Sequence, residues 1–230
     1  MKKIILILLI TFSPWAYSQK ITATSWLVAD GEGNIIKSVN ADEQRSIASI
    51  TKLMTAMVVL DAQQDLSENL NGNTRKELLQ LMLVKSDNKA AETLCNNYPS
   101  GHGSCITAMN LKAKLLGLTE TRYVDSSGLG IMNVSTAQEL VQIVLAASKY
   151  PHIIEASRTA QGTLKKHRKS FVFRNTNPLV ATHDFIVSKT GYIRASGGCI
   201  VMMLNTKIGQ RIVVLLNSKN THTRIPEAYK

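Results

Sequence analysis

The stretch that most limits the possible folds of this chain is residues 50–60, because it is apolar on almost every side. It reads Ile-Thr-Lys-Leu-Met-Thr-Ala-Met-Val-Val-Leu and directly follows Ser49. Eleven residues favour a helix over a strand, and an apolar surface all round indicates a helix enclosed by other elements. A chain of 230 residues with 44% hydrophobic content can supply that enclosure within one domain.

The segments around this helix predict an α+β fold. Residues 21–30 and 35–39 read as a β-hairpin, because the turn signal Asp-Gly-Glu-Gly separates two β-branched runs. Residues 221–230 predict a short terminal helix. Helical spacing also occurs at residues 74–85, 88–97, 104–116 and 135–149, and short apolar strands are predicted at 170–173, 184–189, 199–206 and 211–217. We therefore expect one antiparallel sheet built from the N- and C-terminal segments, flanked by helices, with a mostly helical insertion at about residues 67–157.

The N-terminus reads as a secretory signal peptide over residues 1–18. Two lysines precede the apolar run Ile4–Ile10, and the small residues Ala16 and Ser18 occupy the positions that a signal peptidase requires. The apolar run is shorter than the roughly 20 residues that span a bilayer. We expect cleavage, a single mature domain over residues 19–230 in the periplasm, and no membrane anchor after cleavage.

The chain is basic, with a formal net charge of +11, which favours anionic partners. The run Lys-Lys-His-Arg-Lys at residues 165–169 would indicate nucleic-acid binding in a cytosolic protein. In an exported protein we expect no nucleic-acid partner. The run is then either a solvated loop or hairpin, or a surface attracted to an anionic cell-wall polymer.

The first chemical motif is Ser49-Ile50-Thr51-Lys52. Ser49 and Lys52 lie one helical turn apart on the same face, so the hydroxyl can give its proton to a neutral amine. The helix N-terminus favours negative charge at the oxygen, and burial lowers the pKa of a lysine. The spacing is common by chance, and Ser86 and Lys89 share it, but the buried helix favours Ser49.

Two further motifs carry suitable groups. Ser86-Asp87-Asn88 lies between two predicted helices and either presents a hydroxyl and a carboxamide together or simply caps the second helix. Lys189-Thr190-Gly191 ends a predicted strand. A cation, a hydroxyl and a residue without Cβ would let a substrate backbone lie along the strand edge and bind its carboxylate, although an ordinary strand exit has the same letters.

The order of the three motifs resembles that of the penicillin-binding proteins and class A β-lactamases, whose patterns are S-x-x-K, S-D-N and K-T-G. The chain is similar to the low-molecular-mass penicillin-binding proteins, the D-alanyl-D-alanine peptidase family, and looks closest to periplasmic murein DD-endopeptidases. The segments that carry the similarity are residues 45–56, 113–118, 173–177 and 189–192. The resemblance implies a β-lactamase/transpeptidase-like fold.

The resemblance also implies catalytic roles. Ser49 would be the nucleophile and Lys52 its base, and a positive Lys189 would help to keep Lys52 neutral by repulsion. Ser86 with Lys189 would return the proton to the departing amine, while Asn88 positions the substrate amide. These residues must converge in space, and we expect one hydroxyl to contact both amines.

The remaining implied site residues bind substrate. The backbone N–H groups of Ser49 and Tyr192 would form an oxyanion hole. Thr190 and Gly191 would line the substrate strand, and Arg224 falls where the family has a carboxylate-binding arginine. No metal or cofactor is implied. The expected activity is a serine D-alanyl-D-alanine endopeptidase or carboxypeptidase that hydrolyses peptidoglycan stem peptides through an acyl-enzyme and is acylated by β-lactams.

Two departures from the family pattern affect this expectation. Between Asp65 and Leu78 the chain is shorter than is usual in the family, which bears on substrate choice. The chain also ends at Lys230 without the C-terminal β domain and amphipathic anchor of the carboxypeptidase relatives.

Two other functions fit part of the sequence. A class A-like β-lactamase needs a Glu that activates the deacylating water, and Glu92 with Asn96 has the right letters but lies close behind Asn88, within a predicted helix. A non-catalytic β-lactam-binding or muropeptide-binding protein would keep the motifs without turnover.

Three cysteines remain to be placed. Cys95 and Cys105 enclose a Pro- and Gly-containing loop and favour a disulfide after export, with free thiols or zinc ligation together with His102 as alternatives. Cys199 lies in an apolar run and is expected to be a small buried side chain.

Overall fold

The computed structural model describes residues 21–166 and 169–228. The predicted signal peptide at residues 1–18 lies outside the described residues, as do two positions of the basic run. Within the described ranges, no helix is both long enough and apolar enough to cross a membrane. The division into a signal peptide and one domain with a helical insertion stays a prediction.

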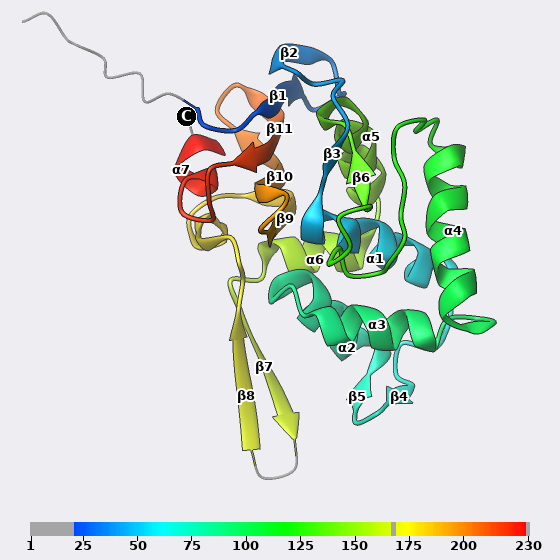
Figure 1. Ribbon diagram of the computed structural model, residues 1–230. Helices are drawn as coiled ribbons and strands as arrows, with labels where there is room; N and C mark the ends of the chain where they lie inside the picture. Colours follow the sequence, from blue (N-terminus) through cyan, green and yellow to red (C-terminus); the bar gives the residue numbers. More distant parts are fainter. Residues whose placement is uncertain (1–20, 167–168, 229–230) are drawn as a thin grey trace, which may run out of the picture.

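The centre of the molecule is a five-stranded antiparallel sheet that joins the two ends of the chain (Figure 1). Its order is β2-β1-β11-β10-β9. The N-terminal hairpin enters through β1, which pairs with β11 from Ser25 opposite Leu216 to Asp30 opposite Arg211. The strands are β1 Ser25–Asp30, β2 Ile35–Val39, β9 Phe185–Ile193, β10 Gly197–Thr206 and β11 Gly209–Ser218. The predicted sheet of both terminal segments is confirmed.

The helix predicted to be enclosed is α1, Thr51–Asp61, preceded by the short 3-10 turn η1, Ala48–Ile50. Every residue of α1 from Thr51 to Val59 is buried. It packs against α2, α3, α4 and α5, and together with the inward side chains of the sheet it forms the main hydrophobic core. A smaller core cluster around Phe185 and Met202 lies on the opposite face of the sheet.

Helices α2 to α5 pack around α1, and α6 packs against α2 and β9 (Figure 1). Thr74 and Glu77 form a capping box that starts α2, which is why a helix begins there. The four predicted helical segments are confirmed, although the third begins at Gly101 rather than at residue 104. A further helix beginning at Pro151 was not predicted. The bounds are α2 Arg75–Val84, α3 Asn88–Asn96, α4 Gly101–Leu115, α5 Ala137–Ala147 and α6 Pro151–Arg158.

A two-stranded hairpin of β7, Gln161–Lys166, and β8, Lys169–Arg174, projects from the body (Figure 1). Leu164 of β7 and Phe173 of β8 are buried, and both strands contact α2. Strand β8 agrees with the prediction and β7 was not predicted. The basic run therefore begins on one strand of a hairpin and ends on the other.

Small elements complete the chain. Strands β3, Arg45–Ser46, and β6, Val134–Ser135, pair with each other. Where the chain is shorter than expected for the family, β4, Asn69–Leu70, and β5, Asn73–Thr74, form a short hairpin. The last elements are η2, Pro178–Ala181, and the predicted terminal helix α7, Arg224–Ala228.

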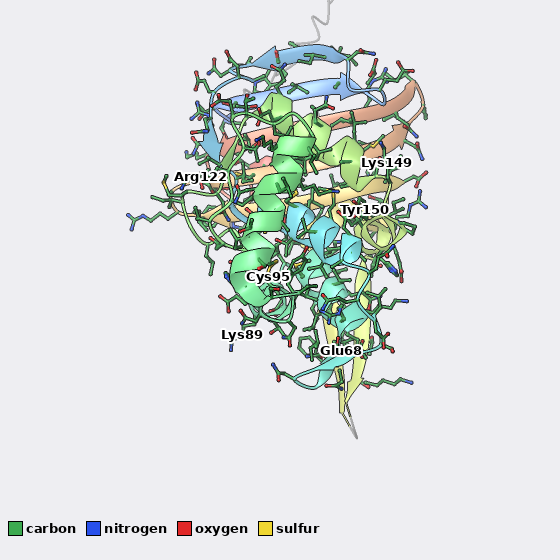
Figure 2. The ribbon with its side chains drawn as sticks, turned by 90° about the vertical axis from the view of Figure 1, so that its right-hand side faces the viewer. Glu68, Lys89, Cys95, Arg122, Lys149 and Tyr150 are labelled. Carbon is green, nitrogen blue, oxygen red and sulfur yellow. A yellow bond between two sulfur atoms is a disulfide. The ribbon has the colours of Figure 1, made fainter. Side chains whose placement is uncertain are left out.

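Cys95 in α3 and Cys105 in α4 form a disulfide that joins the two helices (Figure 2). The pairing confirms the favoured prediction and takes both sulfurs away from zinc. No cluster of metal-binding side chains occurs in the described ranges. Cys199 is a buried free thiol in β10, as expected.

Removing this disulfide should lower the free energy of unfolding. The bond closes a loop with a sequence separation of 10 residues, which corresponds to about 3 kcal/mol from the entropy of the unfolded chain. Denaturant unfolding of a variant carrying Cys95→Ala and Cys105→Ala should show this loss. A reducing agent should shift the midpoint of the wild type and leave that of the variant unchanged; equal midpoints for the two proteins without reductant would contradict the prediction.

Candidate active site

Ser49 lies in η1, at the point where the chain enters the N-terminus of α1. The residue before it, Ala48, has a φ of 45° and is therefore in the left-handed region that residues with a Cβ rarely adopt. Ser86 is a second such residue, with a φ of 62°. Strained backbone of this kind persists only where surrounding contacts enforce it, and it concentrates at functional sites.

The Lys52 amine is buried and meets three partners. Its Nζ lies 2.9 Å from Ser49 Oγ and 2.8 Å from Asn88 Oδ1, and it also contacts the Ser127 carbonyl oxygen. A carboxamide oxygen and a backbone carbonyl can only accept hydrogen bonds. A neutral amine has two N–H groups and one lone pair, so the two carbonyl oxygens take both N–H groups. The lone pair is then directed at the Ser49 hydroxyl.

Burial lowers the pKa of Lys52 to about 8, and the negative charges of Asp125 and Asp87 act in the opposite direction. Burial was the expected cause from the sequence, and it is the main cause, since α1 lies inside the core. The additional repulsion from Lys189 that the family resemblance implied is not among the causes that act on Lys52. A useful fraction of Lys52 is thus neutral at mildly alkaline pH.

Lys189 extends from β9 to the second hydroxyl. Its Nζ donates to Ser86 Oγ and to the Thr190 carbonyl oxygen, both at 2.8 Å. Burial, with the positive charges of Lys52 and Arg224, lowers the pKa of Lys189 well below its ordinary value. Burial and repulsion thus oppose a positive charge on Lys189, and the prediction that this amine is protonated in the resting site stays a prediction.

The motif residues do converge, but not as one hydroxyl touching two amines. Within the described residues, Ser49 contacts Lys52 and Ser86 contacts Lys189. The capping alternative for the second motif holds for its middle residue, because Asp87 Oδ1 accepts from the Ala90 N–H at the start of α3. The residues on either side of Asp87 contact the two lysines: Ser86 accepts from Lys189, and Asn88 accepts from Lys52.

The Gly191 backbone closes the site from the side of β9. A Cβ at Gly191 would lie 2.9 Å from the Ser49 nitrogen, so only glycine allows this approach. The Thr190 carbonyl faces Lys189 Nζ, and alternate residues of a strand direct their N–H and C=O groups to the same edge. The Tyr192 N–H therefore points to the same edge as that carbonyl.

Two predicted substrate-binding side chains have protein partners in this structure. Thr190 Oγ1 donates to Thr176 Oγ1 at 2.6 Å. Arg224 is buried, and its Nη1 donates to the Gly191 carbonyl oxygen while its Nε has no partner among the described residues. Carboxylate binding by Arg224 stays a prediction.

The loop of residues 124–130 belongs to the site and was missed in the sequence. It supplies the Ser127 carbonyl to Lys52, and a Cβ at Gly128 would lie 1.9 Å from the Ala48 carbonyl oxygen. A backbone acceptor carries no residue identity, so no motif marks it. The turn-forming run Asp-Ser-Ser-Gly at residues 125–128 was the one available signal.

The fold and the two serine–lysine pairs define a class, the serine acyltransferases that include the penicillin-binding proteins. Penicillin-binding protein D2 of Listeria monocytogenes, in its cefotaxime-bound form, is similar with a TM-score of 0.81 and 25% identity, covering 91% of this chain and 95% of its own. The Streptomyces K15 DD-transpeptidase has a TM-score of 0.81 at 25% identity, with 91% and 95% covered. The predicted fold class is confirmed.

Sequence comparison gives the family. The profile described as D-alanyl-D-alanine carboxypeptidase matches residues 13–72 and 68–220, two stretches that meet at the β4–β5 hairpin. The D-alanyl-D-alanine endopeptidases of Escherichia coli K12 and Pseudomonas aeruginosa are 37% and 35% identical, covering 94% and 91% of this chain and 82% and 76% of their own lengths. The chain belongs to the D-alanyl-D-alanine carboxypeptidase family of serine peptidases, as its motifs predicted.

Gly128→Ala should disrupt the site, whereas Gly72→Ala should not. Both glycines have a positive φ, 82° and 89°, so both substitutions carry the same backbone strain of about 1 kcal/mol. Only at Gly128 does the new Cβ also collide with backbone; at Gly72 nothing lies within 4 Å. We expect Gly128→Ala to be less stable than Gly72→Ala by at least about 1 kcal/mol. Thermal unfolding of both variants measures this difference, and equal melting temperatures would refute it.

Proposed function

We propose that the protein hydrolyses D-alanyl peptide bonds of peptidoglycan stem peptides through an acyl-enzyme on Ser49. The observation that carries the proposal is the Lys52 amine, whose N–H groups are occupied by Asn88 and Ser127 so that its lone pair faces the Ser49 hydroxyl. That arrangement makes Lys52 a general base for one particular oxygen.

In the acylation step, Ser49 Oγ attacks the carbonyl carbon of the D-alanyl bond while Lys52 accepts the hydroxyl proton. The carbonyl oxygen becomes an oxyanion, held by the Ser49 and Tyr192 N–H groups; one such donor typically contributes about 3–4 kcal/mol. Breakage of the C–N bond requires a proton on the departing amine. Ser86 gives that proton and is resupplied by Lys189, with which it shares a hydrogen bond.

Hydrolysis of the ester then completes the cycle. Before this step Lys52 releases to solvent the proton that it took from Ser49, and Lys189 regains from solvent the proton that it gave to Ser86. Water then attacks the acyl carbon while the neutral Lys52 takes one proton from it, and Lys52 returns that proton to Ser49 Oγ as the ester C–O bond breaks. The Asn88 carboxamide oxygen accepts from Lys52, and its nitrogen, which has no acceptor among the described residues, can donate to the substrate carbonyl. A β-lactam carries a comparable carbonyl on a strained amide and would acylate the same oxygen. The structural relative from Listeria monocytogenes is described in cefotaxime-bound and ampicillin-bound forms.

Bond preference and location complete the proposal. Relatives from Escherichia coli, Pseudomonas aeruginosa and Haemophilus influenzae are named endopeptidases, and more distant relatives from Bacillus subtilis and Mycobacterium tuberculosis are named carboxypeptidases. The higher identity to the first group supports cleavage of the D-alanyl cross-link. The N-terminal sequence supports export and action in the periplasm.

Ser49→Ala should abolish covalent penicillin labelling and muropeptide cleavage, because it removes the hydroxyl that faces the Lys52 lone pair. Labelling with a fluorescent penicillin, followed by denaturing electrophoresis, detects the acyl-enzyme. Separation of products after incubation with cross-linked muropeptides measures turnover and distinguishes cross-link from terminal cleavage.

Ser170→Ala, on the exposed face of β8, is the matched control and should label like the wild type. Persistent labelling of Ser49→Ala would place the nucleophile elsewhere. Stoichiometric labelling of the wild type with uncut dimers would favour a binding protein, and rapid turnover of a chromogenic cephalosporin would favour a β-lactamase.

The acylation rate should rise with pH through about 8, the pKa of Lys52. The neutral amine is the reactive form, and burial lowers its pKa, so activity is lost as pH falls. At one unit below the pKa about one tenth of the amine is neutral, and the rate should be about tenfold below its plateau. Penicillin acylation rates between about pH 6 and 9 test this. A rate independent of pH over that range, in protein shown to stay folded, would exclude Lys52 as the base.

A further inference from the structure

The Asp125 carboxylate organises the loop of residues 124–130. Its Oδ1 accepts from the Ser127 N–H at 2.7 Å, the Ser127 hydroxyl at 3.0 Å and the Gly128 N–H at 2.6 Å. Its Oδ2 accepts from the Gly130 N–H at 2.7 Å. Burial would raise the pKa of this carboxyl, but the hydrogen bonds outweigh it and hold the pKa below the ordinary value. Asp125 is therefore an anion around which the loop is wound.

The loop is also tied to the helix that carries Lys52. The Asn133 carboxamide nitrogen donates to Thr51 Oγ1 at 3.2 Å and to the Asp125 carbonyl oxygen at 3.1 Å. Thr55 Oγ1 donates to the Ser126 carbonyl oxygen at 2.7 Å. These contacts hold the loop against the first turns of α1.

The result is a fixed position for one carbonyl oxygen, that of Ser127, which accepts from Lys52 Nζ. If this carbonyl moved away, one N–H of the neutral amine would lose its acceptor. The amine could then rotate, and its lone pair would no longer be held toward Ser49. None of the three sequence motifs includes Asp125.

We propose that Asp125 is a positioning residue for acyl transfer, which acts by holding the Ser127 carbonyl against Lys52 and by setting the charge that this amine faces. The inference rests on the proposed function, because it concerns the base of that reaction. The hydrogen bonds of the Asp125 carboxylate go to its own loop and not to Ser49, so it acts through Lys52.

Two carboxylates act on Lys52, Asp125 from the loop and Asp87 from the cap of α3. The second amine, Lys189 of β9, is coupled to Lys52 by mutual repulsion of their protonated forms. The two carboxylates favour the protonated amine, and the second amine disfavours it. Loss of the negative charge at position 125 should therefore make Lys52 easier to deprotonate.

Two substitutions separate the hydrogen bonds from the charge. Asp125→Asn removes the charge but keeps an Oδ1 that can accept the Ser127 and Gly128 hydrogen bonds, losing only the bond from Gly130. Asp125→Ala removes the charge and all of these bonds. In a plot of acylation rate against pH, the acidic limb is the range in which the rate falls as Lys52 becomes protonated. Both variants should move this limb to lower pH. At the plateau, Asp125→Ala should lose about 100-fold in rate through misplacement of the amine, and Asp125→Asn less than about tenfold.

Asp65→Asn is the matched control. Asp65 accepts from the Ser67 N–H and hydroxyl, at 2.8 and 2.7 Å, in the same way as Asp125 accepts from Ser127. Asp65 is exposed, however, lies just before the β4–β5 hairpin, and is not among the charges that act on Lys52. Its acylation profile should superpose on that of the wild type. Asp87→Asn removes the other charge facing Lys52 without touching the loop, and should shift the limb while keeping more plateau rate than Asp125→Ala.

Acylation is measured with penicillin on the full chain, with thermal unfolding of each variant to establish folding. An unshifted acidic limb in a folded Asp125→Asn variant overturns the inference. So does a plateau rate for Asp125→Ala equal to that for Asp125→Asn. If Asp125→Ala does not fold, the shift in Asp125→Asn decides alone. A wild-type protein that penicillin does not acylate would instead remove the proposed function, so the two failures are distinguishable.

Discussion

The site depends on one interaction, the hydrogen bonding of a lysine amine buried in the first turn of α1. Taking an amine out of water disfavours its charged form, and the pKa falls to about 8. A neutral amine left without partners would cost stability, and here Asn88 and Ser127 accept its two N–H groups. The helical insertion, the loop after α4 and the sheet must all be in place for these acceptors to meet α1 (Figure 1). The environment of this amine is thus a product of the tertiary fold and not of its own segment.

This explains how much the sequence could predict. The helix behind Ser49, the sheet of both chain ends and the disulfide follow from local patterns of apolar residues, turns and cysteines, and each is present. Helix α6 was missed because its eight residues, which begin with proline, show only a short apolar face. Strand β7 was missed because Gln-Gly-Thr lacks a run of β-forming residues, and it forms by pairing with β8. In the site, the motif residues were found through their order along the chain. The contact of the Ser127 carbonyl with Lys52 was not found, and neither was the division into two hydroxyl–amine pairs. Both depend on backbone geometry that residue types do not encode.

Two glycines allow two backbone segments to approach Ser49 closely. A Cβ at either Gly128 or Gly191 would lie 2.9 Å from the Ser49 nitrogen. Gly191 was recognised as part of a motif, whereas Gly128 was not, although its position is the more crowded because the Ala48 carbonyl oxygen lies 1.9 Å from the same point. Close packing of main chain on main chain thus restricts the position of Ser49 and brings its nitrogen close to the backbone of β9 at Gly191. An oxyanion hole made of backbone groups needs this rigidity, since its donors must be in place before charge develops.

The two serine–lysine pairs also bear on how a proton crosses the site. Over residues 21–166 and 169–228, no hydrogen bond joins Ser49 to Lys189 or Lys52 to Ser86. The proton that Lys52 takes from Ser49 therefore has no continuous path to Ser86 within the protein alone. A substrate whose scissile nitrogen lay between the two pairs would contact both of them. That nitrogen must gain a proton as the C–N bond breaks, so it is the natural acceptor of a proton from the Ser86–Lys189 pair. Burial lowers the pKa of both amines, and repulsion lowers that of Lys189 further, which favours transfer of a proton from the site to the departing amine. The electrostatics of the site thus already favour the direction in which the proposed reaction moves its proton.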